Sequence, residues 1–337
     1  MKEQGIWRRR KNETQRELFF ILRCLLSVCC ALLIVIFSPC LFITYASEKE
    51  SRVNRCDLTS LLRVYDPDTY EILRSELAHN WDYTPYLSDP DRPVDSIGTI
   101  VHEAFHSYSY THGVYSWNPD TKSLNHSEAF YLGRRQITLI RYEDIFPSEK
   151  AAKGISAKHR TIRYAAYVGK GSELSSNQDG IYGLFNEFCA YYWGMHAMEA
   201  MYPYLKKHAT SVKDWKVFVT DYCNYRNAYA EFYLYMLEYF RYAKRFKPDV
   251  YDKLLGNRDF LCTLRTMQQR YEKLIHRYER KLNTLSRQYN GRSLRIGSEH
   301  GIVWLGSYGW GAGDDAYDIL MPIILSRKYK IIHRQCF

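Results

Sequence analysis

The chain of 337 residues lacks the signatures of several well-marked classes of protein. It has no Cys-x-x-Cys pair, which argues against a zinc ribbon or a thioredoxin-like redox site. It has no internal repeat, and its 46% hydrophobic and 25% charged residues exclude a collagen-like, low-complexity or wholly disordered chain. No nucleic-acid-binding motif accompanies its net charge of +10. We therefore expect a globular chain with a substantial core and no nucleic-acid partner.

One long hydrophobic run lies near the N-terminus. Residues 24–45 carry no charged side chain, and as a helix they would span about 33 Å, enough for a bilayer core. Residues 1–23 carry seven Lys and Arg against three Glu, which keeps this side cytoplasmic by the positive-inside rule. We therefore expect a basic cytoplasmic tail (1–23), a transmembrane signal-anchor (24–45) and an extracytoplasmic domain (48–337) at the cell membrane. A cleaved signal peptide, which would make the domain secreted, is the open alternative.

Apolar periodicity after this run predicts an α+β fold that is mainly helical. Residues that repeat every three or four positions, with capping residues and breakers, predict helices over residues 68–80, 95–110 and 181–202. The segment from Phe130 to Arg141 alternates weakly, as a strand does, and residues 163–168 are predicted to be its partner strand.

Two longer helices are expected in the C-terminal half. Apolar residues recur every three or four positions from Trp215 to Tyr239 and from Leu264 to Tyr289. Lys247-Pro248 and Gly256-Asn257 bracket the connection, so the pattern predicts a long antiparallel helical hairpin. Residues 241–295 contain fifteen Lys and Arg against five Asp and Glu. This excess indicates either a solvated outer face or contact with an anionic cell-surface polymer.

The clearest chemical motif is His102-Glu103-Ala104-Phe105-His106 on one of the expected helices. Histidines four residues apart lie one turn apart on the same face, so both imidazoles can bind one Zn²⁺. Glu103 follows the first histidine and can act as general base on a metal-bound water. A chain with eleven His and nineteen Glu in 337 residues would contain this pattern by chance only about 0.02 times. We therefore expect zinc at this helix.

With this motif, the sequence resembles the zincin metallopeptidases, whose branches differ in the third metal ligand. The segment from Asn186 to Tyr192 (NEFCAYY) resembles the glutamate helix of the gluzincins, and the resemblance makes Glu187 the third ligand. Glu187 shares a helical face with apolar residues, where a carboxylate needs a partner. Ala190 matches the alanine of several gluzincin families. Tyr191 stands where those families often have an aspartate that holds the first histidine, so the partner of His102 stays unassigned.

Other residues compete for the third position. His112 follows His102 by ten residues, the spacing of the metzincin motif HExxHxxGxxH, although Ser109 replaces its glycine. A histidine that closes the helix at its C-terminus is the other interpretation of His112. The acidic residues that sequence leaves open as ligands are Asp95, Glu128 and Glu143. A side chain that stabilises the oxyanion is also expected, and the candidates near the glutamate helix are Tyr191, Tyr192 and His196.

These patterns together predict a membrane-anchored zinc metallopeptidase of gluzincin type. Its α+β, mainly helical domain would contain a zincin-like core, built from the HExxH helix and the glutamate helix, beside the helical hairpin. His102, His106 and Glu187 would hold Zn²⁺, and Glu103 would be the catalytic residue that hydrolyses a peptide or protein substrate. Two other functions stay open: a membrane-tethered interaction protein with structural or no zinc, and a zinc amidase acting on cell-wall peptide.

Overall fold

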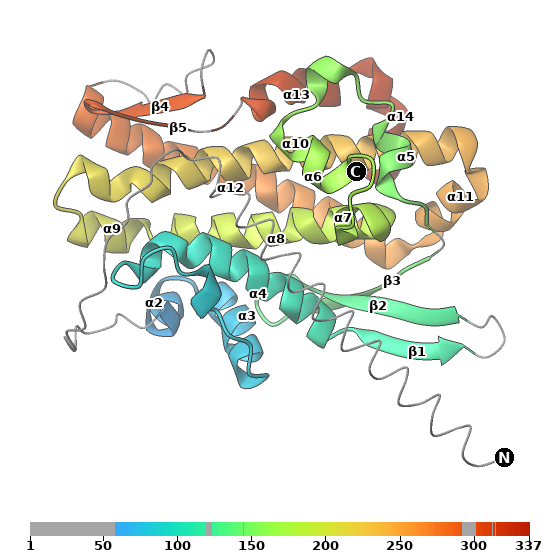
Figure 1. Ribbon diagram of the computed structural model, residues 1–337, viewed down its shortest axis with the longest axis horizontal. Coiled ribbons are helices and arrows are strands. Elements are labelled where there is room, and N and C mark those ends of the chain that lie inside the picture. Colours follow the sequence, from blue (N-terminus) through green and yellow to red (C-terminus); the bar gives the residue numbers. More distant parts are fainter. Residues whose placement is uncertain (1–57, 119–122, 144, 292–300, 312, 314) are drawn as a thin grey trace. The chain divides into compact units, whose positions relative to one another are not determined.

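The computed structural model describes residues 58–118, 123–143, 145–291, 301–311, 313 and 315–337 (Figure 1). These residues form a mainly helical α+β fold, which confirms the predicted fold class at this coarse level. Its centre consists of three long helices: α8 (Gly180–Ala200), α10 (Lys216–Phe246) and α12 (Arg258–Asn290). Almost every residue of α8 is buried. Because this helix is apolar on all sides, it needs neighbours around its whole circumference.

Helices α10 and α12 confirm the predicted C-terminal hairpin. The apolar seam of α12 is buried while its charged face is exposed, and the hydroxyl of Tyr271 donates to the carbonyl of Tyr225 on α10 at 2.8 Å. The connection is itself a short helix, α11 (Pro248–Gly256), with Pro248 at its first position. The Asn257 side chain then caps α12. Contact of the basic residues of this hairpin with an anionic polymer stays a prediction.

The helices that precede the sheet confirm two of the predicted helices. They are α2 (Leu58–Tyr65), α3 (Pro67–Ala78) and α4 (Ile97–Thr111), and two 3₁₀ turns, η1 (Thr84–Tyr86) and η2 (Pro93–Ser96), lead into α4. Asp66 begins α3 by accepting a hydrogen bond from the backbone N–H of Thr69 at 3.3 Å. α3 lies against α4, and α4 lies against α8 (Figure 1). The HExxH helix is therefore held between α3 and α8.

Two glycines allow α4 and α8 to approach closely. A Cβ on Gly194 would lie 2.7 Å from the carbonyl oxygen of Gly98, and a Cβ on Gly98 would collide with the hydroxyl of Tyr225. No side chain larger than hydrogen fits at either position without a shift of the backbone or of Tyr225. The two helices run in opposite directions from this contact, so residues one and two turns after Gly98 face residues about two turns before Gly194.

A three-stranded antiparallel sheet follows α4, in the order β1 (Val114–Asn118), β2 (Ser123–Tyr131) and β3 (Ile137–Arg141). In its register, Glu128 of β2 lies opposite Ile140 of β3. The hydroxyl of Ser109 on α4 donates to the carbonyl of Ala129 on β2 at 2.8 Å and so fixes the sheet to the helix. The weak strand predicted over residues 130–141 is the end of β2, a turn and β3.

The prediction of a strand at residues 163–168 is wrong, because this segment forms helix α6 (Ile162–Val168). The backbone N–H of Arg163 donates to the Glu231 carboxylate at 3.1 Å, and its guanidinium lies 2.6 Å from the other carboxylate oxygen. Glu231 belongs to α10, far along the sequence. The short sequence Arg-Tyr-Ala-Ala-Tyr-Val could not reveal a helix that is fixed by such a distant residue.

The remaining elements surround the three central helices. Between β3 and α8 lie α5 (Ser148–Ala152), the turn η3 (Ala157–His159), α6 and α7 (Ser175–Gln178). Between α8 and α10 lie α9 (Tyr202–His208) and the turn η4 (Val212–Trp215). After α12, the hairpin of β4 (Ile302–Leu305) and β5 (Tyr308–Gly311) is followed by α13 (Ala316–Ile324), η5 (Arg327–Tyr329) and α14 (Lys330–Cys336). Both α13 and α14 contact α10.

The membrane prediction requires correction. Every helix in the described part of the chain is too short or too polar to cross a bilayer. Even α8, with its 21 mostly buried residues, carries Glu187, His196 and Glu199. The segments 1–23 and 24–45, from which the prediction came, lie outside the described residues. The transmembrane signal-anchor, the single-pass membrane location and the extracytoplasmic placement of residues 48–337 are contradicted by this finding and are not retained.

Candidate metal centre

The contact between α4 and α8 brings together the three residues predicted to hold a metal. His102 and His106 lie one turn apart on α4, and Glu187 lies opposite them on α8. The Nε2 atoms of the two histidines are 3.1 Å apart. Oε2 of Glu187 lies 3.7 Å from Nε2 of His102 and 3.5 Å from Nε2 of His106. The ligand atoms therefore form a nearly equilateral triangle.

This triangle has the dimensions of a zinc site. Ligand atoms that lie 2.0–2.1 Å from a tetrahedral Zn²⁺ are separated from one another by about 3.3 Å. The three observed separations, from 3.1 to 3.7 Å, bracket this value. Two imidazole nitrogens and one carboxylate oxygen also form a donor set that zinc prefers. A single Zn²⁺ thus fits the three residues with side-chain adjustments of a few tenths of an ångström.

The burial of Glu187 provides a separate test of this fit. Its side chain is 9% exposed, and Oε2 has no hydrogen-bond partner among the residues that the structure describes. A buried carboxylate oxygen without a donor is costly, because it has lost its water without replacement. The orphaned oxygen is the one that faces both histidines. A cation at the centre of the triangle would satisfy it.

His106 is oriented by an amide on the neighbouring helix. Its Nδ1 lies 2.5 Å from Oδ1 of Asn186, while Nδ2 of Asn186 donates to a carboxylate oxygen of Glu128 at 2.8 Å and to Ser109 at 3.0 Å. Because the amide nitrogen points to Glu128, its oxygen must accept, and Nδ1 of His106 must carry the hydrogen. The lone pair of Nε2 is then directed at the metal position, as a zinc ligand requires.

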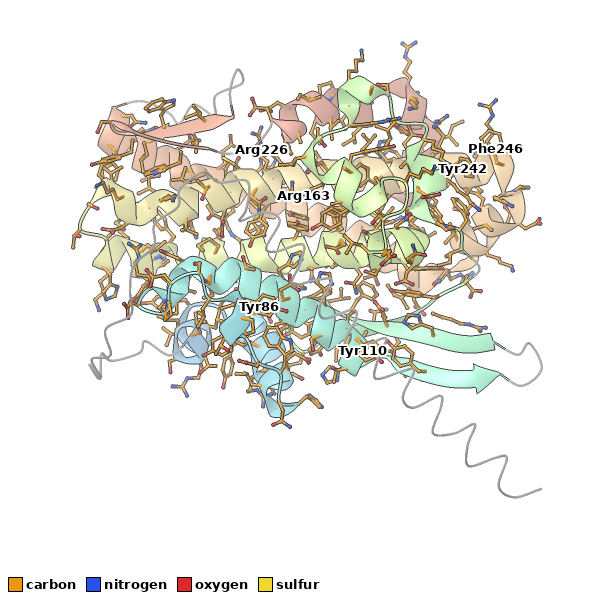
Figure 2. All side chains as sticks on the ribbon, in the orientation of Figure 1. Tyr86, Tyr110, Arg163, Arg226, Tyr242 and Phe246 are labelled. Carbon is orange, nitrogen blue, oxygen red and sulfur yellow. The ribbon has the colours of Figure 1, made fainter. Side chains whose placement is uncertain are left out.

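His102 is held differently, by an aromatic ring. The ring of Tyr191 meets the imidazole of His102 edge to face, with centroids 4.4 Å apart. The Tyr191 hydroxyl accepts from Nε of Arg163 at 3.2 Å and lies 2.9 Å from the hydroxyl of Tyr167. Arg163, labelled in Figure 2, is paired in turn with Glu231. The residue that replaces the expected aspartate therefore connects the centre to a buried ion pair.

The electrostatics of the three ionisable side chains on α4 differ. Burial, with smaller contributions from His106 and Arg163, holds the pKa of His102 well below its usual value, so its imidazole is neutral. Burial would also lower the pKa of His106, but Glu187, together with Glu103 and Asn186, outweighs burial and raises this pKa to about 9. A metal ion would take the place of that proton. Burial raises the pKa of Glu103 to about 7, the range that suits a general base at neutral pH.

The structure places the competing ligand candidates elsewhere. His112, the alternative third ligand, lies 3.8 Å from Glu76 and 2.7 Å from Ser75, in a separate cluster, because α4 continues straight through Ser109 to Thr111. The other competing carboxylates face a cation or an amide: Asp95 pairs with Arg92, Glu143 with Arg141, and Glu128 binds Asn186. None of these four residues belongs to the triangle.

The candidates for stabilising an oxyanion are also separated. Nδ1 of His196 lies 2.8 Å from the carboxylate of Asp66, and the ring of Tyr192 packs against Tyr271 with centroids 5.7 Å apart. Of the three candidates, Tyr191 is the one that contacts a ligand histidine. Sequence analysis missed Asn186, Arg163 and Tyr167 as neighbours of the centre. Asn186 could have been noticed, because a buried amide next to a proposed ligand needs partners.

Comparison with protein-family models, curated proteins and solved structures finds no match to this chain. The interpretation of the centre therefore depends on its own residues and geometry.

Proposed function

We propose that this protein is a zinc-dependent metallopeptidase of gluzincin type. The observation that carries the proposal is the triangle of His102, His106 and Glu187, with its orphaned carboxylate oxygen and with Glu103 beside it. A structural zinc site has no need of a carboxylate that follows a ligand histidine, has a pKa of about 7 and lies close enough to His106 and Glu187 to feel their charges. The α4–α8 contact supports a zincin-like core, in which one helix supplies HExxH and a second helix supplies the glutamate.

In hydrolysis, Glu103 would transfer protons while His102 and His106 would hold the metal. When bound, Zn²⁺ supplies Lewis acidity that lowers the pKa of water and polarises the scissile carbonyl. Glu103 would accept a proton from the attacking water on its carboxylate and pass it to the leaving amide nitrogen. His102 and His106 would stay neutral and oriented, the first by Tyr191 and the second by Asn186.

A donor for the developing negative charge is available beside His102. Arg163 donates to the oxygen of Tyr191, and within the Tyr191–Tyr167 pair either hydroxyl can donate to the other. When Tyr191 is the donor, the hydroxyl hydrogen of Tyr167 can point toward a substrate oxygen. The buried charge of Arg163 polarises this chain of hydroxyls. We therefore assign Tyr167, rather than one of the three residues predicted from sequence, to the stabilisation of the oxyanion.

The test is the activity of the full-length chain and of the variant Glu103→Gln. With zinc loaded, the wild type is incubated with unfolded protein and, separately, with cell-wall peptide, and products are identified by mass spectrometry. We expect cleavage of unfolded protein by the wild type, and a loss of about 10²–10⁴-fold in Glu103→Gln with zinc content unchanged.

The matched control is Glu173→Gln, which alters an exposed glutamate and should retain full activity. Cleavage of cell-wall peptide alone would assign the centre to a zinc amidase. Zinc binding without turnover of either substrate would contradict the peptidase and favour an interaction protein with structural zinc.

A further inference from the structure

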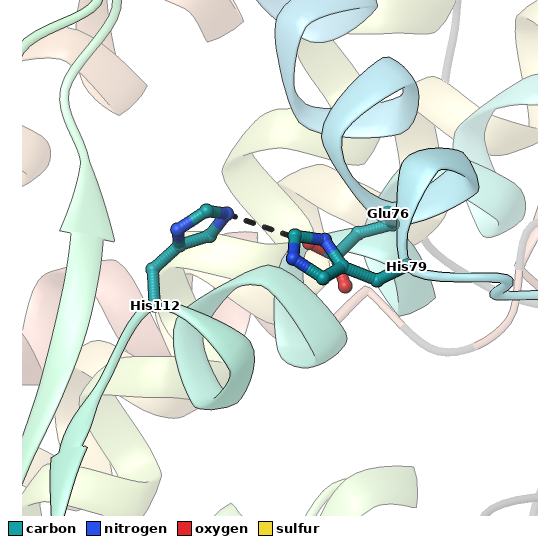
Figure 3. A group of neighbouring side chains, drawn as sticks. All are labelled: Glu76, His79 and His112. Atoms are coloured by element: carbon teal, nitrogen blue, oxygen red, sulfur yellow. Dashed lines mark ion pairs between the residues drawn. The ribbon is translucent and has the colours of Figure 1, made fainter.

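A second group of histidine and glutamate side chains lies where α3 and α4 end (Figure 3). Glu76 comes from the last turn of α3, His79 follows that helix, and His112 follows α4. One potential ligand atom from each residue lies within 4.8 Å of those of the other two. None of these residues takes part in the first centre.

Glu76 is fully buried, and among the described residues one of its two carboxylate oxygens accepts hydrogen bonds while the other does not. Its Oε2 accepts hydrogen bonds from the hydroxyls of Ser107 at 2.5 Å and Thr111 at 3.3 Å. Its Oε1 has no hydrogen-bond partner within the described part of the chain and lies 3.8 Å from Nε2 of His112. The side chain is 0% exposed, so water does not replace the missing donor. The oxygen without a donor points into the cluster, as the corresponding oxygen of Glu187 does in the first centre.

Both histidines present a lone pair to this position. Nδ1 of His79 lies 2.9 Å from the carbonyl of Ser75, which can only accept, so Nδ1 carries the hydrogen and Nε2 is free. His79 is exposed and can rotate. Nε2 of His112 lies 2.7 Å from the Ser75 hydroxyl, and its ring is held by Tyr108, with centroids 4.2 Å apart. The Ser75 hydroxyl can turn away and leave this nitrogen to a cation.

We propose that Glu76, His79 and His112 form a second zinc site, which fastens the end of α3 to the end of the HExxH helix. Two imidazoles and one carboxylate select Zn²⁺ over Ca²⁺ and Mg²⁺, which prefer oxygen ligands. Oε1 of Glu76 and Nε2 of His112 are 3.8 Å apart, and rotation of the exposed His79 side chain can bring the third ligand atom closer. Neither histidine is followed by an acidic residue, as His102 is by Glu103, because Asn80 follows His79 and Gly113 follows His112, so we assign the site a structural role.

The test is zinc binding to the full-length chain by equilibrium dialysis, with metal content measured by mass spectrometry. We expect about two zinc ions per wild-type chain and about one in His79→Ala, since His79 is exposed and its loss should not prevent folding. Loss of an outer partner already weakens metal binding by about 10–100-fold, so loss of a ligand should weaken the second site by at least about 100-fold. Excess Mg²⁺ or Ca²⁺ should not displace the second ion.

His208→Ala is the matched control. His208 is also exposed, near the end of a helix, and its Nδ1 lies 2.8 Å from the carbonyl four residues earlier, as in His79. This variant should bind as much zinc as the wild type. The variant Glu187→Ala separates the two sites, because it should keep the second ion, and zinc should still raise its melting temperature. Equal zinc affinity and stoichiometry in wild type, His79→Ala and His208→Ala would overturn the second site without affecting the first.

Discussion

The two clusters on α4 use the same residue types but differ in what surrounds them. His102, His106 and Glu187 lie inside the contact with α8, and their outer partners are an amide, an aromatic ring and a buried ion pair. Glu76, His79 and His112 lie at helix ends, supported by hydroxyl groups and partly open to solvent. In the first cluster His102 is followed by a carboxylate, that of Glu103, whereas Asn80 and Gly113 follow the histidines of the second. In our proposals, the first cluster is catalytic because it has an additional base and rigid surroundings, whereas the second has metal-binding side chains alone and has a structural role.

The largest effect is expected from the ion pair behind the first cluster. Arg163→Met would leave Glu231, which is 0% exposed, as an uncompensated buried charge, and should destabilise the fold by about 3–5 kcal/mol. Unfolding in urea, monitored by circular dichroism, measures this loss of stability. The double variant with Glu231→Leu should recover most of it. If the free energy of unfolding of Arg163→Met were within about 1 kcal/mol of the wild-type value, the first cluster would be no more rigidly supported than the second.

Tyr167→Phe tests the donor that the first cluster has and the second lacks. Removal of one oxyanion donor typically reduces kcat by about 10²–10³-fold, so this variant should lose turnover while it keeps its zinc and its substrate KM. Steady-state kinetics and metal analysis separate these effects. The control is Tyr164→Phe. Tyr164 lies on the same helix, but its hydroxyl donates a hydrogen bond to the carbonyl of Ala152. If Tyr167→Phe lost zinc and kept the kcat of its zinc-loaded fraction, Tyr167 would be assigned to metal binding instead.

The outer partners of the two clusters predict different losses of zinc. Asn186→Ala removes the acceptor that orients His106 and should weaken the first site by about 10–100-fold. Ser75→Ala removes a hydroxyl that the second metal would displace from His112, so affinity there should stay the same or rise. Competition with a fluorescent zinc chelator measures both affinities. Equal losses in the two variants would contradict the view that the two clusters are differently organised.

The last prediction concerns Asp221, a carboxylate near α4 whose pKa is affected by another carboxylate rather than by a histidine. Asp221 lies beside Gly98, and burial together with Asp95 raises its pKa to about 8. Its folded-state pKa is above the unfolded value of about 4, so its contribution to stability is present below about pH 4 and is lost as the pH rises through 8. Asp221→Asn should therefore be more stable than wild type above pH 8. Unfolding free energies at pH 5 and pH 8.5 test this, with the exposed Asp252→Asn as control.

The meeting of His102, His106 and Glu187 was predictable because the signals that bring these residues together are local. A spacing of four residues fixes the two histidines on one helical face, and the apolar neighbours of Glu187 indicate that its carboxylate points inward. The seams of α10 and α12 were predictable for the same reason. The outer partners were not predictable, because Glu128 reaches Asn186 only when β2 lies beside α4 and α8. No spacing along the chain encodes this arrangement.

The second cluster and the errors in the prediction have the same origin. Glu76 and His112 meet only because α3 lies against α4, so the sequence suggested His112 as a ligand of the first centre or as the end of its helix, and not as a neighbour of Glu76. Residues 163–168 form a helix because Glu231 on α10 binds Arg163 at its first turn. In each case a contact between distant elements determines the outcome, and local sequence carries no trace of it.

The most direct test of the central claim is anomalous X-ray scattering at the zinc edge from crystals of the full-length chain grown with zinc. We expect a strong peak about 2.0–2.1 Å from Nε2 of His102, Nε2 of His106 and Oε2 of Glu187. Absence of a peak between these three residues in zinc-saturated crystals would contradict the metal centre and, with it, the proposed peptidase.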